Sequence, residues 1–214
     1  NVGKSTLFNC LSNTKAQSAN FPFCTIEPNH SIINVPDKRL ATLQGIVNPE
    51  KVIPATVEIV DIAGLVKGAS KGEGLGNKFL ANIRETDAII HVLRCFDNDN
   101  ITHVDGSVDP VRDKEIIDIE LQLKDLESLN NRMEKVNRTA KSGDKDAVRE
   151  KEVLQKAIAF IESSNNIRSI DLDMPDINKY LKPLQLITSK PVLYVCNVDE
   201  NSINSTNNHV ESVK

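Results

Sequence analysis

The sequence predicts an α/β protein with a mostly parallel sheet and an inserted antiparallel helical hairpin. Three observations point to this fold class: short apolar runs rich in valine and isoleucine, helical patterns between them, and one long polar stretch with apolar residues at helical spacing. Strands that are covered on both faces read as nearly continuous apolar runs. Strands that alternate with helices along a chain are typical of α/β folds.

Four apolar runs are predicted to form strands, and three helical patterns are interspersed with them. The predicted strands span 30–35, 55–64, 88–96 and 190–200. The predicted helices span 4–13, 36–46 and 75–85. The last three apolar runs are the most continuous in hydrophobicity, which indicates strands buried inside a sheet.

The polar stretch from about 113 to 165 carries two amphipathic patterns around the turn sequence "KSGDKDA". Apolar residues recur at helical spacing before and after the turn: Ile116, Ile119, Leu123, Leu126, Leu129 and Met133, then Val148, Val153, Leu154, Ile158 and Ile161. Two such helices joined by a glycine-containing turn predict an antiparallel hairpin. Both an arm for a partner and a simple elaboration of the fold fit this pattern.

The composition is that of an ordinary globular protein with no global preference for nucleic acid. The chain has 214 residues and a net charge of −4, so any binding to RNA would need a local basic patch. Its four cysteines show no C-x-x-C spacing, which predicts reduced thiols in a cytoplasmic protein instead of a disulfide frame or a zinc site. No apolar run is long enough to span a membrane, so no membrane partner is expected.

The chain opens with "NVGKSTLFNC", which contains the second half of a phosphate-binding loop. A complete loop reads G-x-x-x-x-G-K-[ST], and its end is matched by Gly3, Lys4 and Ser5. The backbone N–H groups of such a loop hold phosphate oxygens, its lysine reaches the β and γ phosphates, and its serine hydroxyl binds Mg²⁺. A capped surface helix is the alternative. The predicted nucleotide-binding residues are Asn1, Val2, Gly3, Lys4, Ser5 and Thr6.

Two further segments complete a predicted magnesium site. The strand "VEIVDIAG" ends in Asp61 and is followed by Gly64, which makes a D-x-x-G element. A carboxylate at the end of a strand can bind Mg²⁺ through water, and the Gly64 N–H can contact a γ-phosphate. Thr25, in "FPFCTIEPN", is expected to complete the coordination. The predicted metal ligands are Ser5, Thr25 and Asp61; a turn signal and a solvated threonine are the alternatives.

The strand at 190–200 ends in "NVDE", where a guanine-specific site would carry N-K-x-D. The aspartate of that motif accepts hydrogen bonds from guanine groups that adenine lacks. Here Val198 stands at the lysine position and Glu200 at the aspartate position, which removes the reason to prefer guanine. Such a polar match is worth roughly 10⁴–10⁵ in selectivity. We expect Asn197, Val198 and Glu200 at the base, with ATP favoured and GTP kept as the alternative.

With these four elements in order, the sequence resembles the YchF/Ola1 family of Obg-related P-loop GTPases. The resemblance covers essentially the whole chain, and it is carried by "NVGKSTLFN", "NFPFCTIEPN", "DIAGLVKGASKGEGLGNKFLANIRE", "HVLRCF" and "NVDE". It implies a P-loop NTPase fold, with a G domain formed by 1–112 and 184–214 and a helical, coiled-coil insertion at 113–183. It also implies that the chain is truncated at both ends and lacks a C-terminal TGS domain.

The resemblance further implies ATP hydrolysis with a histidine in place of the usual catalytic glutamine. The glutamine position after D-x-x-G is occupied by Leu65, which cannot orient a water molecule. The residue that the family proposes instead falls on His103, for which a solvated loop histidine is the alternative. The expected catalytic residues are therefore His103, Lys4 and Gly64. His91, inside a predicted strand, is expected to be structural.

The sequence as a whole predicts a conformational switch that hydrolyses ATP, with Mg²⁺ as cofactor. The resemblance implies association with the ribosome or a ribosomal subunit, and a role in translation or stress regulation. Lys67, Lys71 and Lys78 lie in or beside a glycine-rich segment, where they would contact ribosomal RNA or belong to a solvated loop. Two rival hypotheses are a GTP-specific switch and a non-hydrolysing scaffold whose hairpin binds a partner.

Overall fold

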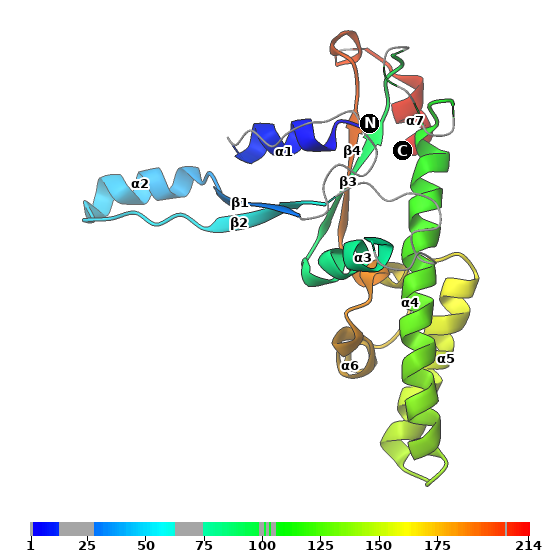
Figure 1. The fold of residues 1–214 in the computed structure, drawn as a ribbon. Helices are drawn as coiled ribbons and strands as arrows, with labels where there is room; N and C mark the ends of the chain where they lie inside the picture. The colour runs from blue at the N-terminus through cyan, green and yellow to red at the C-terminus, as the bar shows by residue number, and fades with distance from the viewer. Residues whose placement is uncertain are drawn as a thin grey trace. The chain divides into compact units, whose positions relative to one another are not determined.

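The computed structural model describes residues 2–12, 28–62, 75–98, 101, 103, 106–203 and 205–214. The chain divides into two compact units, Gly3–Ala63 and Gly64–Lys214, and Val2 groups with the second unit. Figure 1 shows the helices and strands of both units. Among the described residues, no helix is both long enough and apolar enough to cross a membrane.

The first unit is a two-stranded ribbon with two helices. Its elements are α1 (Lys4–Ser12), β1 (Asn29–Asn34), α2 (Lys38–Val47) and β2 (Thr56–Asp61). The strands pair antiparallel, with Asn29 opposite Asp61 at one end and Asn34 opposite Thr56 at the other. The helix α2 connects the two strands and lies beyond the end of the ribbon where β1 ends and β2 begins (Figure 1). Its N-terminus is capped by Asp37, whose side chain accepts a hydrogen bond from the Arg39 backbone N–H.

The second unit combines a parallel pair of strands with a long helical hairpin. Its main elements are α3 (Leu75–Glu85), β3 (Ile89–Arg94), α4 (Pro110–Ala140), α5 (Lys145–Glu162), α6 (Met174–Asp176), β4 (Val192–Asn197) and α7 (Asn208–Val213). Short 3-10 segments lie at Ile167–Ser169, Lys182–Leu184, Ile187–Ser189 and Glu200–Ser202, and a π-helical turn lies at Ile177–Leu181. The strands β3 and β4 pair in parallel, from Ile89 opposite Val192 to Arg94 opposite Asn197.

All four predicted strands are present; the first lies within one residue of its predicted range, and the other three are shorter than predicted, by up to three residues at an end. Among the described residues they form two separate pairs, of which only β3–β4 is parallel. The apolar pattern of β1 did not reveal that it runs antiparallel to β2, because side-chain alternation is the same in both directions. A mostly parallel sheet therefore stays a prediction.

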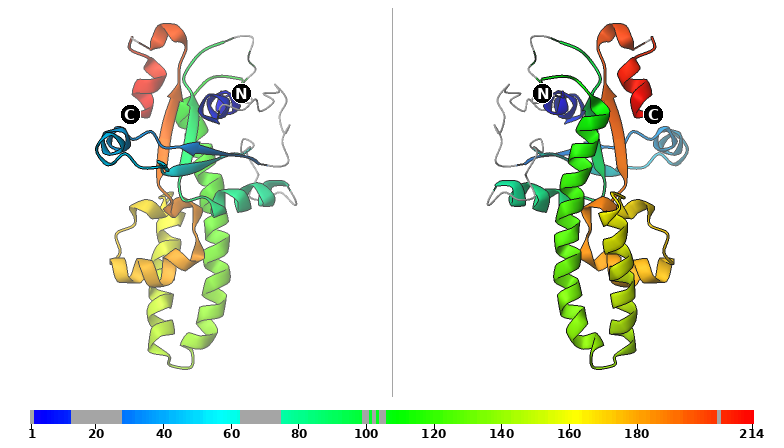
Figure 2. Two further views of the ribbon diagram at one scale, coloured as in Figure 1. Left: turned by 90° about the vertical axis from the view of Figure 1, so that its left-hand side faces the viewer. Right: turned by 90° about the vertical axis from the view of Figure 1, so that its right-hand side faces the viewer.

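The helices α4 and α5 run antiparallel and side by side, as Figures 1 and 2 show. Asp109 caps α4 by accepting a hydrogen bond from the Arg112 backbone N–H at 3.0 Å, and Pro110 occupies the first turn. In the turn between the helices, Gly143 has φ 84°, a left-handed conformation that favours glycine. Asp144 then caps α5. Local sequence signals thus set both ends of the turn.

The hydrophobic core of the second unit lies between α4, α5 and the segment that follows α5. Its buried members are Leu129, Val136, Ala147, Val153, Leu154, Ala157, Ile161, Ile167, Tyr180, Leu181 and Leu186. Three residues predicted for the apolar faces of the hairpin are exposed instead: Ile119 by 50%, Leu123 by 39% and Val148 by 41%. For these three residues the predicted face was wrong.

For Ile119 and Leu123, the reason is that the N-terminal half of α4 buries polar side chains. Asp118, Gln122 and Asp125 recur at helical spacing and are all buried. Asp125 is fully buried, and its carboxylate accepts hydrogen bonds from the Ile187 N–H at 2.8 Å, the Thr188 N–H at 2.7 Å and the Thr188 hydroxyl at 2.7 Å. A buried polar group is tolerated when it is hydrogen-bonded in this way. Which face of α4 points inward therefore depends on hydrogen-bonding partners such as Thr188 as well as on hydrophobicity.

Candidate functional site

The candidate site in the first unit begins where the chain enters α1. Gly3 has φ 94°, a backbone conformation that side chains with a Cβ rarely adopt. Its carbonyl accepts a hydrogen bond from the Leu7 N–H at 3.0 Å, which closes the first helical turn. This positive φ explains why the G-K-S motif has a glycine at its first position. It directs Lys4 and Ser5 into the first turn of α1, where backbone N–H groups suit an anion.

Lys4 and Ser5 both contact Asp61, which ends β2. Asp61 is only 7% exposed. The Lys4 ammonium forms an ion pair with Asp61 Oδ1, and the Ser5 hydroxyl donates to Asp61 Oδ2 at 3.0 Å. The structure therefore brings together three predicted residues that lie up to 57 positions apart in the sequence. We call them the Lys4–Ser5–Asp61 cluster.

The oxygen atoms of this cluster fit Mg²⁺. Carboxylate and hydroxyl oxygens are hard ligands, and Mg²⁺ commonly binds one or two carboxylates together with substrate phosphates. In the part of the chain that the structure describes, no group of three or more His, Cys, Asp or Glu side chains could hold a metal. Among the described residues, a metal at Asp61 could also draw on the Ser5 hydroxyl, with phosphate oxygens as further ligands.

Several predicted residues lie outside the described part of the chain. They are Asn1, Thr25, Gly64, Leu65, Lys67 and Lys71, together with the side chain of Lys78. Thr6 is described and exposed on α1. The roles predicted for all of these residues stay predictions.

The predicted base-contacting residues lie at the end of β4, in the second unit. The Asn197 side-chain N–H donates to the carbonyl of Val2 at 3.0 Å, and the Asn197 carbonyl accepts from the Cys95 N–H at 2.7 Å. Val198 is half-buried and Glu200 is exposed. Sequence reasoning assigned no role to Asp199, which accepts hydrogen bonds from the backbone N–H and the hydroxyl of Ser202. These bonds lower the pKa of Asp199. The Asp199 side chain thereby caps the 3-10 segment Glu200–Ser202.

His103 is not a solvated loop residue. Its side chain is 13% exposed, and its Nε2 lies 2.8 Å from Asp113 Oδ2 on the first turn of α4. The loop before it is held by Arg94, whose guanidinium donates to the carbonyls of Phe96, Asn98 and Ile101 at 3.0–3.2 Å. Sequence reasoning missed both Arg94 and Asp113. An arginine at the end of a buried strand was the available signal for Arg94.

His91 has the structural role that was expected of a histidine inside a strand. Its ring lies 5.5 Å from the ring of Tyr194 on the paired strand β4. Burial lowers the pKa of His91, so the imidazole is neutral near pH 7. A neutral buried ring of this kind packs against its neighbours and does not need a catalytic explanation.

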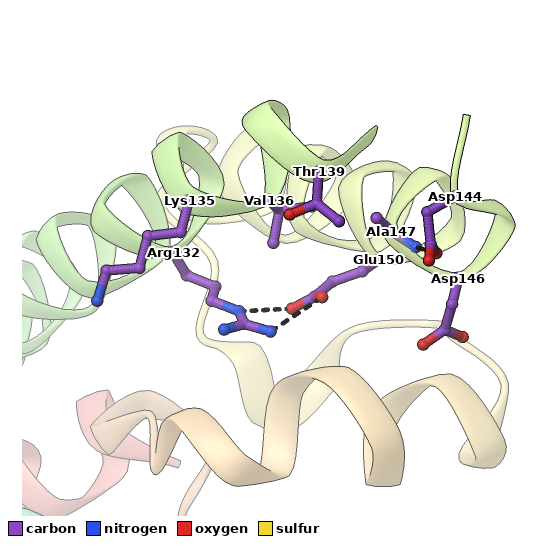
Figure 3. A pocket seen from close by; sticks show the side chains of 8 residues that line it. All are labelled: Arg132, Lys135, Val136, Thr139, Asp144, Asp146, Ala147 and Glu150. Atoms are coloured by element: carbon purple, nitrogen blue, oxygen red, sulfur yellow. Dashed lines mark hydrogen bonds and ion pairs between the residues drawn. The ribbon is translucent and has the colours of Figure 1, made fainter. Parts of the chain in front are cut away.

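A polar hollow of about 260 Å³ lies between α4 and α5 near their turn (Figure 3). Arg132 and Glu150 face one another across it, with N–O distances of 2.6 and 3.0 Å. The lining residues are Arg132, Lys135, Val136, Thr139, Asp144, Asp146, Ala147 and Glu150. None of them was predicted to bind nucleotide, and the paired charges give the hollow a structural explanation.

Comparison with known proteins connects this geometry to a protein family. The sequence profile described as "50S ribosome-binding GTPase" matches residues 1–132. A protein of Haemophilus ducreyi described as "Ribosome-binding ATPase YchF" is 55% identical over 202 residues, which are 94% of this chain and 55% of that protein. The Bacillus subtilis protein of the same description is 54% identical over 203 residues, 95% of this chain and 55% of its own length.

Two further matches are to YchF proteins as well. The Escherichia coli O157:H7 protein described as "Ribosome-binding ATPase YchF" is 50% identical over 214 residues, 100% of this chain and 58% of its own length. A solved structure, "Structure of the Schizosaccharomyces pombe YchF GTPase", matches with a TM-score of 0.79 and 36% identity over 100% of this chain and 58% of that chain. The chain thus spans about half the length of the curated relatives it matches. These matches confirm the resemblance to YchF proteins and the P-loop GTPase fold.

Proposed function

Because this chain belongs to the family of 50S ribosome-binding GTPases, we propose that it is the nucleotide-binding part of a P-loop NTPase that hydrolyses ATP. The observation that carries the proposal is the meeting of Lys4 and Ser5 on the buried carboxylate of Asp61. An ammonium, a hydroxyl and a carboxylate arranged in this way are the groups that hold a magnesium-bound triphosphate in P-loop enzymes. The description of the curated relatives as ATPases supports ATP as the nucleotide.

The domain organisation that goes with this function is a G domain interrupted by a helical insertion. We assign 1–112 and 184–214 to the G domain and 113–183 to the insertion. Two observations support the assignment: the solved YchF structure matches the whole chain, and α4 and α5 connect the parallel strands β3 and β4. Parallel neighbours need a crossover connection, which the hairpin supplies.

The residues of the phosphate loop have distinct roles in this proposal. Backbone N–H groups of 1–6 cradle the phosphates, and Lys4 binds the β and γ phosphates. Ser5, Thr25 and Asp61 hold Mg²⁺, which neutralises phosphate charge when bound. The Gly64 N–H contacts the γ-phosphate. A triphosphate competes with Asp61 for the Lys4 ammonium, so nucleotide binding exchanges the ion pair that the structure shows.

Hydrolysis requires a group that activates water, and Leu65 cannot do this. We assign the role to His103 as general base. The support is that His103 is held by a carboxylate instead of being free in solvent. A positioned general base contributes roughly 10²–10⁴-fold to a rate. We expect His103→Ala to lower kcat for phosphate release by that factor, with little change in nucleotide affinity.

The choice of nucleotide is tested by phosphate release from ATP and GTP with the full-length protein. We expect a higher kcat/KM for ATP, because Val198 and Glu200 do not provide the guanine-specific contacts. The matched variant restores N-K-x-D through Val198→Lys and Glu200→Asp, and we expect it to move selectivity toward GTP. A GTP preference of about a hundredfold in the unmodified protein would reverse the assignment. Undetectable release from either nucleotide would favour the scaffold hypothesis.

The relatives' description as ribosome-binding proteins supports the ribosome as partner, and the tip of the hairpin carries cations that could contact RNA. Four exposed cations lie there: Lys135, Arg138, Lys141 and Lys145. Within the described ranges, none of the four forms a salt bridge, whereas the nearby Arg132 is paired with Glu150. Unpaired cations can contact RNA phosphates. We propose that this basic tip binds ribosomal RNA and that the protein acts in the cytoplasm, where ribosomes lie.

The basic tip is tested by charge reversal. We expect Lys141→Glu with Lys145→Glu to weaken co-sedimentation with ribosomes and to lower the slope of log affinity against log salt by about 2, since two phosphate contacts are lost. The control reverses Lys156 and Lys182, which are exposed but lie away from the turn. Equal losses in the two double variants would show a net-charge effect and exclude a specific contact at the tip.

A further inference from the structure

We propose that Asp113 is the positioning residue for His103, so that the first turn of α4 holds the histidine used in hydrolysis. The inference rests on the proposed catalytic role of His103. It extends that role by making the helical hairpin part of the hydrolytic apparatus, because Asp113 belongs to α4.

The geometry of the pair is that of an oriented histidine. His103 Nε2 and Asp113 Oδ2 are 2.8 Å apart, and the two side chains are only 13% and 20% exposed. A partly buried hydrogen bond to a carboxylate is less screened by solvent than one at the surface. The histidine comes from the loop after β3 and the carboxylate from α4, so the contact joins two different elements of the second unit.

The carboxylate of Asp113 is itself held. Its second oxygen, Oδ1, accepts from Arg112 Nη2 at 3.3 Å. The Arg112 guanidinium also donates to the carbonyl of Ser107 at 2.6 Å and to the Ser107 hydroxyl at 3.0 Å. The Asp113 N–H donates to the carbonyl of the capping residue Asp109 at 3.0 Å. Both oxygens and the backbone of Asp113 are therefore restrained before any nucleotide binds.

The histidine is restrained from its other side as well. Arg94 is 3% exposed, and it donates three hydrogen bonds to the carbonyls of Phe96, Asn98 and Ile101. The Gly106 N–H donates to the carbonyl of His103 at 3.2 Å, with Gly106 at φ 77°. The described residues on both sides of His103 are thus held by hydrogen bonds, to Arg94 of β3 before it and at Gly106 after it.

In this proposal, the two ring nitrogens of His103 have different roles. When Nε2 carries the hydrogen and donates it to Asp113, Nδ1 has the lone pair and is the base. In the reaction, a water oxygen forms a bond to the γ-phosphorus, and the bond from phosphorus to the bridging oxygen breaks with its electron pair leaving on ADP. The water proton moves to Nδ1 and is then returned to the released phosphate. Asp113 stabilises the imidazolium that exists between these transfers.

The test is a double-mutant cycle for phosphate release in the full-length protein. We expect Asp113→Asn to lower kcat by at least roughly ten- to a hundredfold, the range typical when a metal-binding histidine loses its carboxylate partner, with KM unchanged. In the His103→Ala background the same change should have no further effect, because a positioning residue acts only through its histidine. The matched control is Asp109→Asn at the start of the same helix, because the Asp109 carboxylate accepts from the Arg112 N–H and asparagine caps helices about as well as aspartate.

The outcomes separate the two levels of the proposal. A normal kcat in His103→Ala would remove the proposed catalytic role. A low kcat in His103→Ala with additive losses in the cycle, or with normal kcat in Asp113→Asn, would overturn the positioning role alone. A raised kcat in Asp113→Asn would show that the carboxylate restrains the histidine, which also overturns it. Asp113→Glu keeps a carboxylate and should recover part of the lost kcat; no recovery in a folded variant contradicts positioning by charge.

Discussion

Replacing Lys4 with alanine is expected to lower kcat for phosphate release from ATP by roughly 10²–10³-fold. The Lys4 ammonium is paired with Asp61 in the structure and stands at the start of α1, where the β and γ phosphates are proposed to bind. Negative charge on the transferring phosphoryl group must be stabilised in the transition state, and a preorganised ammonium does this more strongly in a partly buried site than in water. Phosphate release and isothermal titration with ATP would separate loss of rate from loss of binding.

Two further variants make the Lys4 result specific. Lys38→Ala removes an exposed lysine from α2 in the same unit and should leave kcat unchanged. Lys4→Arg keeps the positive charge but not the compact ammonium, so it should recover little of the lost rate. Thermal unfolding of each variant shows whether the protein stays folded when the buried Asp61 loses its ion pair with Lys4. A Lys4→Ala protein that is folded and retains kcat within about threefold of the unmodified protein would contradict the proposed phosphate site.

Replacing Asp125 with alanine is expected to lower the free energy of unfolding by about 3 kcal/mol. The change leaves three buried donors without their acceptor: the N–H groups of Ile187 and Thr188 and the hydroxyl of Thr188. Burial destabilises the ionised carboxylate and raises the pKa of Asp125, although the three hydrogen bonds act in the opposite direction. Keeping this carboxylate buried therefore has a free-energy cost of its own. The net loss is therefore smaller than three separate unsatisfied donors would suggest.

The Asp125 prediction is measured by urea unfolding followed by circular dichroism. Glu127→Ala is the control, because Glu127 lies two residues further along α4, is exposed, and is paired with Lys124 of the same helix. Its removal should change the free energy of unfolding by less than about 0.5 kcal/mol. Equal losses for the two variants would mean that the buried hydrogen bonds of Asp125 do not stabilise α4 against Ile187–Ser189.

The fold was predictable where the signals are local. The four strands, the two helices of the hairpin and the turn between them follow from apolar runs, helical spacing, caps and one glycine. The direction of β1 relative to β2 was not predictable, since both directions share the same alternation. Exposure of Ile119 and Leu123 was not predictable either, because the inward face of α4 is chosen by hydrogen-bonding partners such as Thr188.

The residues of the candidate site likewise include some that the sequence predicted and some that only the structure revealed. The G-K-S spacing and the strand-ending aspartate identified Lys4, Ser5 and Asp61, and the structure brings these three side chains together. Asp113 carries no motif, so only the contact with His103 reveals it. The roles of Thr25 and Gly64 are still predictions from the motifs.

By itself, the sequence determined the short-range features: the left-handed glycine that opens α1, the aspartates that cap α4 and α5, and the residue types of the phosphate loop. These depend on neighbouring residues whose spacing is written in the chain. Only the tertiary structure decided that Lys4 meets Asp61 57 positions away, that Asp125 is buried under Thr188, and that α4 holds His103. Contacts between distant segments arise when the whole chain packs, and there the burial of one polar group depends on donors and acceptors supplied by another segment.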